Sequence, residues 1–282
     1  MSIRLWRNAL LLSAVVLIAP SAWAGPAGTE PAGGLPAPRP AADPVSNARL
    51  FTLVLGDGAR QRVLFSAPPD ARGTLVMLPG GSGQIGLEDD GQIRHGDNFV
   101  VRTRTLWLRR GYAVLLADAV DGMNLRGLRS SPRYAAVVEA LVDFAHAHMA
   151  GPVFLLGTSQ GAIAAMNGAA HAPTGRVAGV VLTESVSVMG GSRETVFSAD
   201  PGQVRIPVLI VGNRDDRCNV APPGAAPDIA AALDHSPDVR VLSVSGGQTR
   251  SRKNCGSLTP HGYYGIEVPT VDAIIRWLDG HR

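Results

Sequence analysis

The feature that most constrains the fold is a regular alternation of strand-like and helical segments along most of the chain. Strands that alternate with helices predict a mostly parallel sheet with helices on both faces. The first two strand-like runs differ, because the turn Gly56-Asp57-Gly58 joins them as an antiparallel hairpin. The expected strands are residues 50–55, 61–66, 74–79, 112–118, 153–157, 177–183, 206–212 and 238–244. The expected helices lie near 99–110, 132–149, 159–171, 226–235 and 269–280.

The pentapeptide Gly157-Thr158-Ser159-Gln160-Gly161 has the form G-x-S-x-G. An apolar, strand-like run at 153–156 precedes it and a helical run at 162–167 follows it, so the serine lies on a strand-to-helix turn. Such a turn forces the serine into an exposed, strained backbone position, and the flanking glycines let neighbouring backbone pack closely. This context favours a nucleophile elbow over a chance match in a glycine-rich chain. Ser159 is the predicted nucleophile.

The first residues predict an exported protein. Arg4 and Arg7 precede an apolar stretch at 9–18, and Ala22-Trp23-Ala24 forms a cleavage site. The stretch is shorter than the ~20 residues of a membrane-spanning helix, which favours a signal peptide at 1–24 over a membrane anchor. No later segment is long and apolar enough to span a bilayer. We therefore expect no stable membrane insertion after cleavage and a periplasmic or secreted location.

The mature chain is expected to consist of a leader and one domain. Residues 25–47 are rich in Pro, Gly and Ala, so they predict a flexible leader that cannot bury enough surface to fold. Residues 48–282 have the length of a single α/β domain. The formal charge of +3 falls to about +1 (3 − 2) when Arg4 and Arg7 leave, and the basic residues are scattered. This balance gives no reason to expect a nucleic acid or an anionic membrane as partner.

A serine nucleophile needs a base within hydrogen-bond reach and a carboxylate that orients the base. In the nucleophile-elbow architecture the chain order is Ser, acid, His. Four histidines follow Ser159, of which His171 and His235 end predicted helices and His281 is the penultimate residue. His261 instead lies in a loop after the last predicted strand, where a proline and a glycine hold a turn. His261 is the predicted base.

The predicted acid follows the strand at 206–212. The segment Asn213-Arg214-Asp215-Asp216-Arg217-Cys218 places two carboxylates at the carboxyl end of this strand, where the functional groups of open α/β sheets gather. Adjacent residues on a turn point in different directions, so only one carboxylate can face His261. Asp216 is favoured, and Asp215 stays the alternative.

Cys218 and Cys255 are the two cysteines of the chain. An even count in an exported chain favours a disulfide over two buried free thiols. The bond would tie the acid loop to the histidine loop, either as an aid to catalysis or as a structural staple, and a closed loop of this size stabilises by about 4 kcal/mol. Zinc sites use several Cys and His ligands at short spacing, so no metal site is expected.

A tetrahedral intermediate needs two backbone donors for its oxyanion, usually the amide after the nucleophile and one from a loop after an early strand. Gln160 supplies the first donor. The loop at 78–83 supplies the second, with Gly81 favoured and Ser82 as the alternative. Residues 81–86 also spell G-x-G-x-x-G, but a dinucleotide fingerprint opens a helix and the residues that follow here are turn-like. No nucleotide cofactor is expected.

Together these residues resemble the α/β-hydrolase superfamily over about residues 50–280. The resemblance rests on Leu78-Pro79-Gly80-Gly81 as oxyanion loop, the elbow at 157–161, Asp216 after a late strand and His261 in the last loop. More narrowly, the segments at 157–159, 215–218 and 255–263 are similar to a group of exported bacterial α/β-hydrolases of unassigned substrate. The chain departs from many members in having Pro79-Gly80 where they have His-Gly, and Gln160 where Met, Gly or Arg is more usual.

The resemblance implies an α/β-hydrolase fold and acyl transfer to water without a cofactor. Ser159 would attack a carbonyl, His261 would carry its proton to the leaving group, and Asp216 would fix the imidazole. Many members carry a helical lid where this chain has only the short segment 183–205. We therefore expect a short or absent lid and carboxylic esters of small or accessible molecules as substrates.

Other activities stay open at this point. A peptidase, a thioesterase or a dienelactone-hydrolase-like enzyme uses the same machinery, and a non-catalytic binding protein can share the scaffold. The presence of Ser, Asp and His in the required order favours an enzyme. Val188, Met189 and Phe197 either form an apolar rim of the pocket or pack as ordinary surface residues. The oligomeric state stays open.

Overall fold

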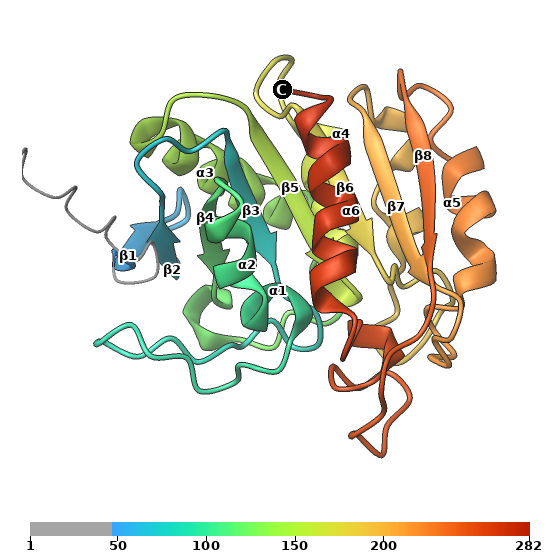
Figure 1. Cartoon of the computed structure of the whole chain (residues 1–282). Coiled ribbons are helices and arrows are strands. Elements are labelled where there is room, and N and C mark those ends of the chain that lie inside the picture. The colour runs from blue at the N-terminus through green and yellow to red at the C-terminus, as the bar shows by residue number, and fades with distance from the viewer. Residues whose placement is uncertain (1–46) are drawn as a thin grey trace, which may run out of the picture. The chain divides into compact units, whose positions relative to one another are not determined.

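The computed structural model describes residues 47–282, so the predicted signal peptide and all but the last residue of the predicted leader lie outside the described residues. The described part contains an eight-stranded sheet with the order β1-β2-β4-β3-β5-β6-β7-β8 (Figure 1). The strands are β1 (Arg49–Val54), β2 (Arg60–Ser66), β3 (Thr74–Leu78), β4 (Ala113–Ala117), β5 (Val153–Thr158), β6 (Gly179–Thr183), β7 (Val208–Asn213) and β8 (Val239–Val244).

The sheet is mostly parallel. Strand β2 is antiparallel to β1 and β4, and the other neighbouring pairs are parallel. Parallel strands end at one edge, so the loops after β3, β5, β7 and β8 gather at the bottom of Figure 1. The predicted fold class, with its antiparallel N-terminal hairpin, is confirmed.

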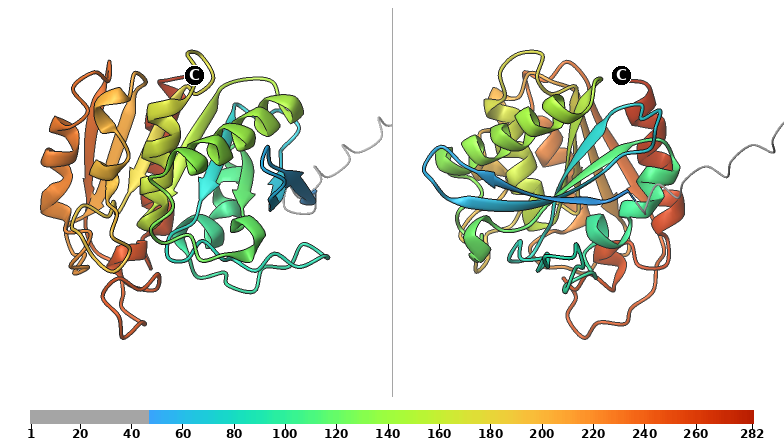
Figure 2. Two further views of the ribbon diagram at one scale, coloured as in Figure 1. Left: turned by 180° about the vertical axis from the view of Figure 1, so that it is seen from behind. Right: turned by 90° about the vertical axis from the view of Figure 1, so that its left-hand side faces the viewer.

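Helices cover both faces of this sheet (Figure 2). The helices are α1 (Phe99–Arg102), α2 (Arg104–Arg109), α3 (Pro132–His148), α4 (Gln160–His171), α5 (Ala226–Ala231) and α6 (Glu267–Asp279). One hydrophobic cluster includes Leu141, Ile163 and Ile229 from α3, α4 and α5. A second cluster includes Trp107 and Ile274 from α2 and α6. Because helices cover both faces, the central strands β3, β4, β5 and β6 are buried along their whole length.

Local chemistry sets the helix boundaries. The predicted helix at 99–110 is divided at Thr103, whose hydroxyl donates to the carbonyl oxygen of Phe99 at 2.6 Å. Helix α3 begins after Ser131, which accepts the backbone N–H of Tyr134, and a proline occupies its first position. The predicted helix at 226–235 is shorter than expected and ends at Ala231.

The segment between β6 and β7 is short, as predicted. It contains two 3₁₀ turns, Val196–Ser198 and Pro201–Gln203, and no longer helix. The sheet edge that carries the loops is therefore not covered by a helical lid from this segment.

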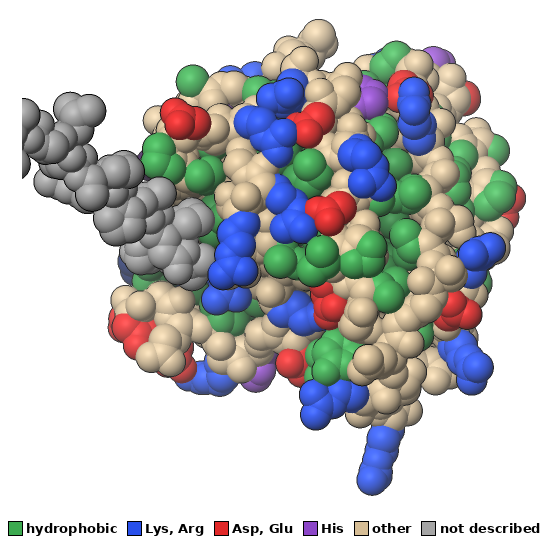
Figure 3. Space-filling view, in the orientation of Figure 1, with side chains coloured by type: hydrophobic (Ala, Val, Ile, Leu, Met, Phe, Trp, Pro, Cys, Tyr) green, Lys and Arg blue, Asp and Glu red, His purple; other side chains and the backbone are tan. Residues whose placement is uncertain are grey.

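None of the helices within residues 47–282 is long and apolar enough to cross a membrane. On the face seen in Figure 3, basic and acidic side chains are interspersed.

Candidate active site

Ser159 lies on the turn between β5 and α4, at the carboxyl end of a central strand. Its backbone has φ 54° and ψ −121°, a conformation that non-glycine residues rarely adopt. A Cβ on Gly157 would lie 2.2 Å from the carbonyl oxygen of Gly161, and a Cβ on Gly161 would lie 2.0 Å from the carbonyl oxygen of Leu78. Close backbone contacts therefore require both glycines, as they do in a nucleophile elbow.

His261 contacts both Ser159 and Asp216. Its Nε2 is 3.0 Å from Ser159 Oγ, and its Nδ1 is 2.7 Å from Asp216 Oδ2. The His261 side chain is 3% exposed and the Asp216 side chain is fully buried. A carboxylate at Nδ1 favours the tautomer with hydrogen on that nitrogen, so Nε2 is free to accept the serine proton.

The turn after β7 points Asp216 inward and Asp215 outward. Asp216 Oδ1 accepts the backbone N–H of Cys218 at 2.8 Å, while Oδ2 meets the imidazole. Asp215 is exposed, and its Oδ2 accepts the backbone N–H of Gly246 at 2.6 Å. Of the two candidates from the sequence, Asp216 is the one that the structure brings to His261.

The histidine loop is held by its own backbone contacts and by a disulfide. His261 lies in a 3₁₀ turn whose cap, Thr259, accepts the backbone N–H of His261 at 3.1 Å. A Cβ on Gly262 would lie 2.0 Å from a backbone oxygen of the same loop. Cys218, two residues after Asp216, is bonded to Cys255, with 4.6 Å between the Cα atoms. The disulfide joins the acid loop to the histidine loop.

The loop after β3 lies against the elbow and carries the candidate oxyanion donors. A Cβ on Gly80 would lie 2.7 Å from the carbonyl oxygen of Thr158, so a side chain does not fit there. Gly81 has φ 62°, in the left-handed region that favours glycine. Within residues 47–282, the N–H groups of Gly81, Ser82 and Gln160 donate to no other residue. These three N–H groups are therefore the candidate oxyanion donors.

A buried arginine that the sequence analysis missed supports this loop. Arg129 is 1% exposed, and its guanidinium donates to the carbonyl oxygens of Gly81 at 3.1 Å and Pro79 at 3.2 Å. Burial lowers the pKa of this guanidinium. In a trans peptide the N–H points opposite to the carbonyl, so Arg129 turns the N–H of Ser82 away from itself. Both Gly81 and Ser82 remain candidates for the second donor.

The rest of the loop after β3 is held by one carboxylate. Asp118, which follows β4, accepts the backbone N–H groups of Ile85 and Leu87, both at 2.8 Å. Its own backbone carbonyl accepts the side-chain amide of Gln61 at 3.0 Å. The G-x-G-x-x-G segment at 81–86 therefore forms a loop anchored on Asp118 and opens no helix.

A cavity of about 630 Å³ opens beside Ser159 and His261. Most of its lining is polar, with Ser82, Gln84, Arg94, His95, Asp97, Asn98, Arg126, Gln160 and Ser257 among the side chains. Val188, Met189 and Phe197 are exposed but do not line this cavity, whose apolar side chains include Ile85 and Val220. The cavity volume is in the range of small-molecule sites.

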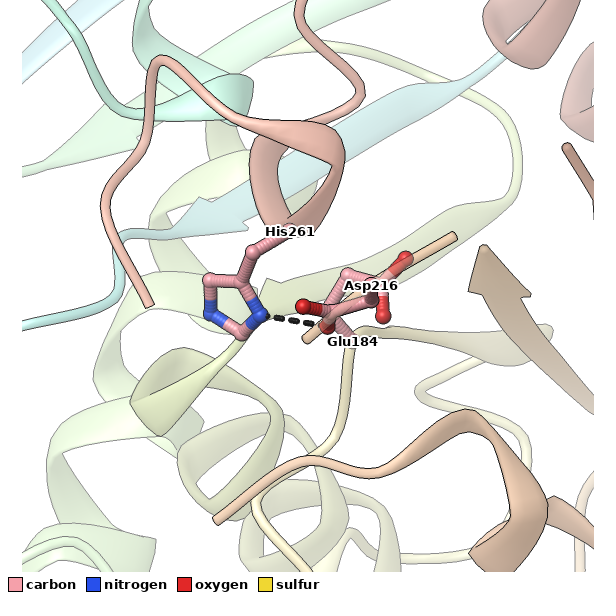
Figure 4. A group of neighbouring side chains, drawn as sticks. All are labelled: Glu184, Asp216 and His261. Atoms are coloured by element: carbon pink, nitrogen blue, oxygen red, sulfur yellow. Dashed lines mark hydrogen bonds and ion pairs between the residues drawn. The ribbon is translucent and has the colours of Figure 1, made fainter. Parts of the chain in front are cut away.

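Glu184 is a buried carboxyl group beside Asp216 that no sequence motif indicated (Figure 4). It follows β6, is 2% exposed and has φ 45°. An oxygen of each carboxyl group and a ring nitrogen of His261 lie within 4.8 Å of one another. Burial, and then the negative charge of Asp216, raise the pKa of Glu184 well above its ordinary value. An acidic residue directly after a buried strand was the only signal in the sequence.

The three side chains have the chemistry of a metal site, but their spacing fits hydrogen bonding better. Tetrahedral ligands around zinc lie roughly 3.3 Å apart, since each is about 2.0–2.1 Å from the ion. His261 Nδ1 and Asp216 Oδ2 are only 2.7 Å apart. This distance matches a charge-assisted hydrogen bond.

Several solved structures resemble this chain. A dienelactone hydrolase from Anabaena variabilis has 16% sequence identity and a TM-score of 0.56, and the match covers 83% of this chain and 99% of that chain. An α/β serine hydrolase without a lid from Xanthomonas campestris has 13% identity and a TM-score of 0.56, with coverage of 82% and 95%. An esterase from Pyrococcus furiosus has 13% identity and a TM-score of 0.54, with coverage of 70% and 81%. No family model and no curated protein sequence matches the chain.

Proposed function

Because this chain has the α/β-hydrolase fold, we propose that it is an exported serine hydrolase that cleaves carboxylic esters of small or accessible molecules. One observation carries the proposal: Ser159, His261 and Asp216 form a continuous hydrogen-bonded chain at the carboxyl ends of the strands. A serine in contact with a buried His–Asp pair is the arrangement that activates a hydroxyl group at neutral pH.

The proposed reaction has two halves. Ser159 Oγ attacks the ester carbonyl while His261 Nε2 takes its proton, and the same proton passes to the alcohol as the acyl-enzyme forms. Water then attacks the acyl-enzyme while His261 takes its proton, and this proton passes to Ser159 Oγ as the acid product leaves. Asp216 stabilises the imidazolium that forms in each half. The N–H of Gln160 and that of Gly81 or Ser82 would bind the oxyanion.

The cavity supports the choice of substrate class. It is open, mostly polar and lined by loops, so it suits small molecules that carry polar groups. Long acyl chains need an extended apolar surface, and the apolar side chains at Val188, Met189 and Phe197 lie outside the lining. We expect short acyl chains to be preferred. Peptides, thioesters and lactones use the same machinery, and a panel of matched substrates separates them.

A fluorophosphonate probe tests the proposed nucleophile. The wild-type protein should be labelled at Ser159 and should hydrolyse a short p-nitrophenyl ester, whereas Ser159→Ala should do neither. Equal labelling of both proteins would show that the hydrolase proposal is wrong. A folded wild type with no labelling and no hydrolysis would favour a binding protein on this scaffold.

The proposed export has its own test. If the signal peptide is cleaved after Ala24, the mature protein begins at Gly25. Intact mass measured on the periplasmic or secreted fraction of an expressing bacterium should match that start. A mass that retains the first residues would contradict the cleavage site.

A further inference from the structure

Glu184 is bonded to the strand that leads into the turn with Asp216. Its backbone N–H donates to the carbonyl oxygen of Val211 at 3.0 Å, and its Oε1 accepts the backbone N–H of Asn213 at 2.8 Å. Both partners belong to β7, the strand that leads into the turn with Asp216. The positive φ of Glu184 is uncommon for a residue with a side chain, and these contacts hold it.

Within the described residues, the groups around Glu184 include no cationic side chain that pairs with its negative charge. The titratable side chains that face it are Asp216, His261 and Tyr263. Tyr263 is fully buried, and its hydroxyl donates to the carbonyl oxygen of Val211 at 3.0 Å. In the described part of the chain no arginine or lysine forms an ion pair with Glu184, and His261 already pairs with Asp216. Two neighbouring buried carboxyl groups cannot both ionise easily, so one of them keeps a proton.

We propose that Glu184 is a positioning residue that stays protonated during catalysis and donates a hydrogen bond to Asp216. The proposal rests on the proposed function, since it concerns the same Ser–His–Asp site. Asp216 then has three partners: the backbone N–H of Cys218, the imidazole of His261 and the Glu184 carboxyl group. With these partners its rotamer is fixed, and the imidazole is fixed with it.

The neutral state of Glu184 also matters for the base. His261 must be unprotonated before the reaction so that it can accept the serine proton. One carboxylate beside it stabilises the imidazolium that forms in the transition state. A second carboxylate at this distance would hold the imidazole in its charged form at higher pH and would remove the base. A proton held by Glu184 keeps the two carboxyl groups at a single negative charge.

The test compares three variants on a short p-nitrophenyl ester across pH. Glu184→Gln keeps a neutral group with an N–H donor, Glu184→Ala removes the group, and Asp215→Asn removes an exposed carboxylate from the neighbouring turn as a control. We expect Glu184→Ala to lower kcat about 10- to 100-fold with little change in KM, because the acid and base lose their alignment. Glu184→Gln should restore kcat to within about threefold of wild type.

The acidic limb of the kcat/KM profile reports whether Glu184 is charged. If Glu184 is neutral, its replacement by Gln leaves the midpoint of this limb unchanged to within about 0.3 pH units, as should Asp215→Asn. A fall of one unit or more in Glu184→Gln alone would show an ionised Glu184 and overturn the proposal. A folded Glu184→Ala with wild-type kcat, or Glu184→Gln as inactive as Glu184→Ala, would also overturn it.

The probe reaction separates failure of this inference from failure of the proposed function. If the wild-type protein reacts with fluorophosphonate at Ser159, the hydrolase proposal stands and the outcome for Glu184 is decided by the pH profile. If Glu184→Ala does not fold, the Gln variant still decides it. If the wild-type protein does not react, the hydrolase proposal fails, and the inference about Glu184 fails with it.

Discussion

The two sides of the candidate site are built by different means. On one side, Asp216 and His261 are buried and their loops are joined by the Cys218–Cys255 disulfide. On the other side, the candidate oxyanion loop is rich in glycine and is held by hydrogen bonds, including two from Arg129. No covalent link within the described residues ties this loop to the rest of the site.

This difference fits what each side has to do. The proton relay depends on two short distances, so burial and a covalent link between the loops favour one arrangement. In the proposed reaction, the candidate oxyanion loop accepts a substrate into an open cavity, and its donors point at an oxygen that carries negative charge only in the transition state. We expect the loss of Asp216 from the relay side to lower kcat much more than the loss of the arginine that supports the donor side.

The largest effect should come from the acid. Asp216→Asn removes the carboxylate that orients His261, and kcat should fall by about 10³- to 10⁴-fold, as expected when the imidazole takes the wrong tautomer. Asp215→Asn, the matched control one residue away, should lose less than about fivefold, because its side chain is exposed and contacts Gly246 instead. Steady-state kinetics on a short p-nitrophenyl ester measure both. The opposite ranking would assign the acid to Asp215.

A smaller loss is expected on the donor side. Arg129→Met removes both hydrogen bonds to the oxyanion loop, and kcat should fall about 10- to 100-fold, less than the loss from a deleted oxyanion donor. KM should change little, since the loop acts mainly on the transition state. Arg129→Lys should recover part of the activity because it can restore one bond. A folded Arg129→Met with wild-type kcat would show that the loop holds its conformation without this arginine.

Local sequence patterns predict some residues of the candidate site and not others. The order of strands and helices follows from local sequence patterns, and Ser159, Asp216 and His261 lie in the loops that follow strands. The sequence does not predict a role for Arg129 or Glu184, because their burial depends on tertiary contacts that no local pattern encodes. An arginine in a loop and an acid after a strand both look like solvated residues until the chain is folded. For the long loop after β3, the sequence predicted only an oxyanion role. It did not predict the hydrogen bonds from this loop to Asp118, because they join segments about thirty residues apart.

Removal of the disulfide should affect stability more than chemistry. The double variant Cys218→Ser, Cys255→Ser loses a bond with a sequence separation of 37 residues. Loop closure by such a bond raises the free energy of unfolding by about 4 kcal/mol, and native strain reduces this gain, so we expect a loss of roughly 2–4 kcal/mol. Urea unfolding followed by tryptophan fluorescence measures this loss. We expect kcat below the transition to fall by no more than about tenfold, because burial still holds His261 against Asp216. A loss as large as that of Asp216→Asn would show that the bond itself sets the relay geometry.

The smallest effect is a change in how stability depends on pH. The pKa of Glu184 is raised in the folded protein, chiefly by burial, so folding favours its protonated form. The stability contributed by that form is fully present below the carboxyl pKa of the unfolded chain, about 4.3, and is lost as the pH rises through the folded pKa. Glu184→Gln cannot ionise and should lose less stability between pH 5 and pH 8 than wild type, while the exposed Glu139→Gln should follow wild type. Urea unfolding at both pH values tests this. Equal losses of stability in wild type and Glu184→Gln would mean that Glu184 is ionised, not protonated, in the folded protein.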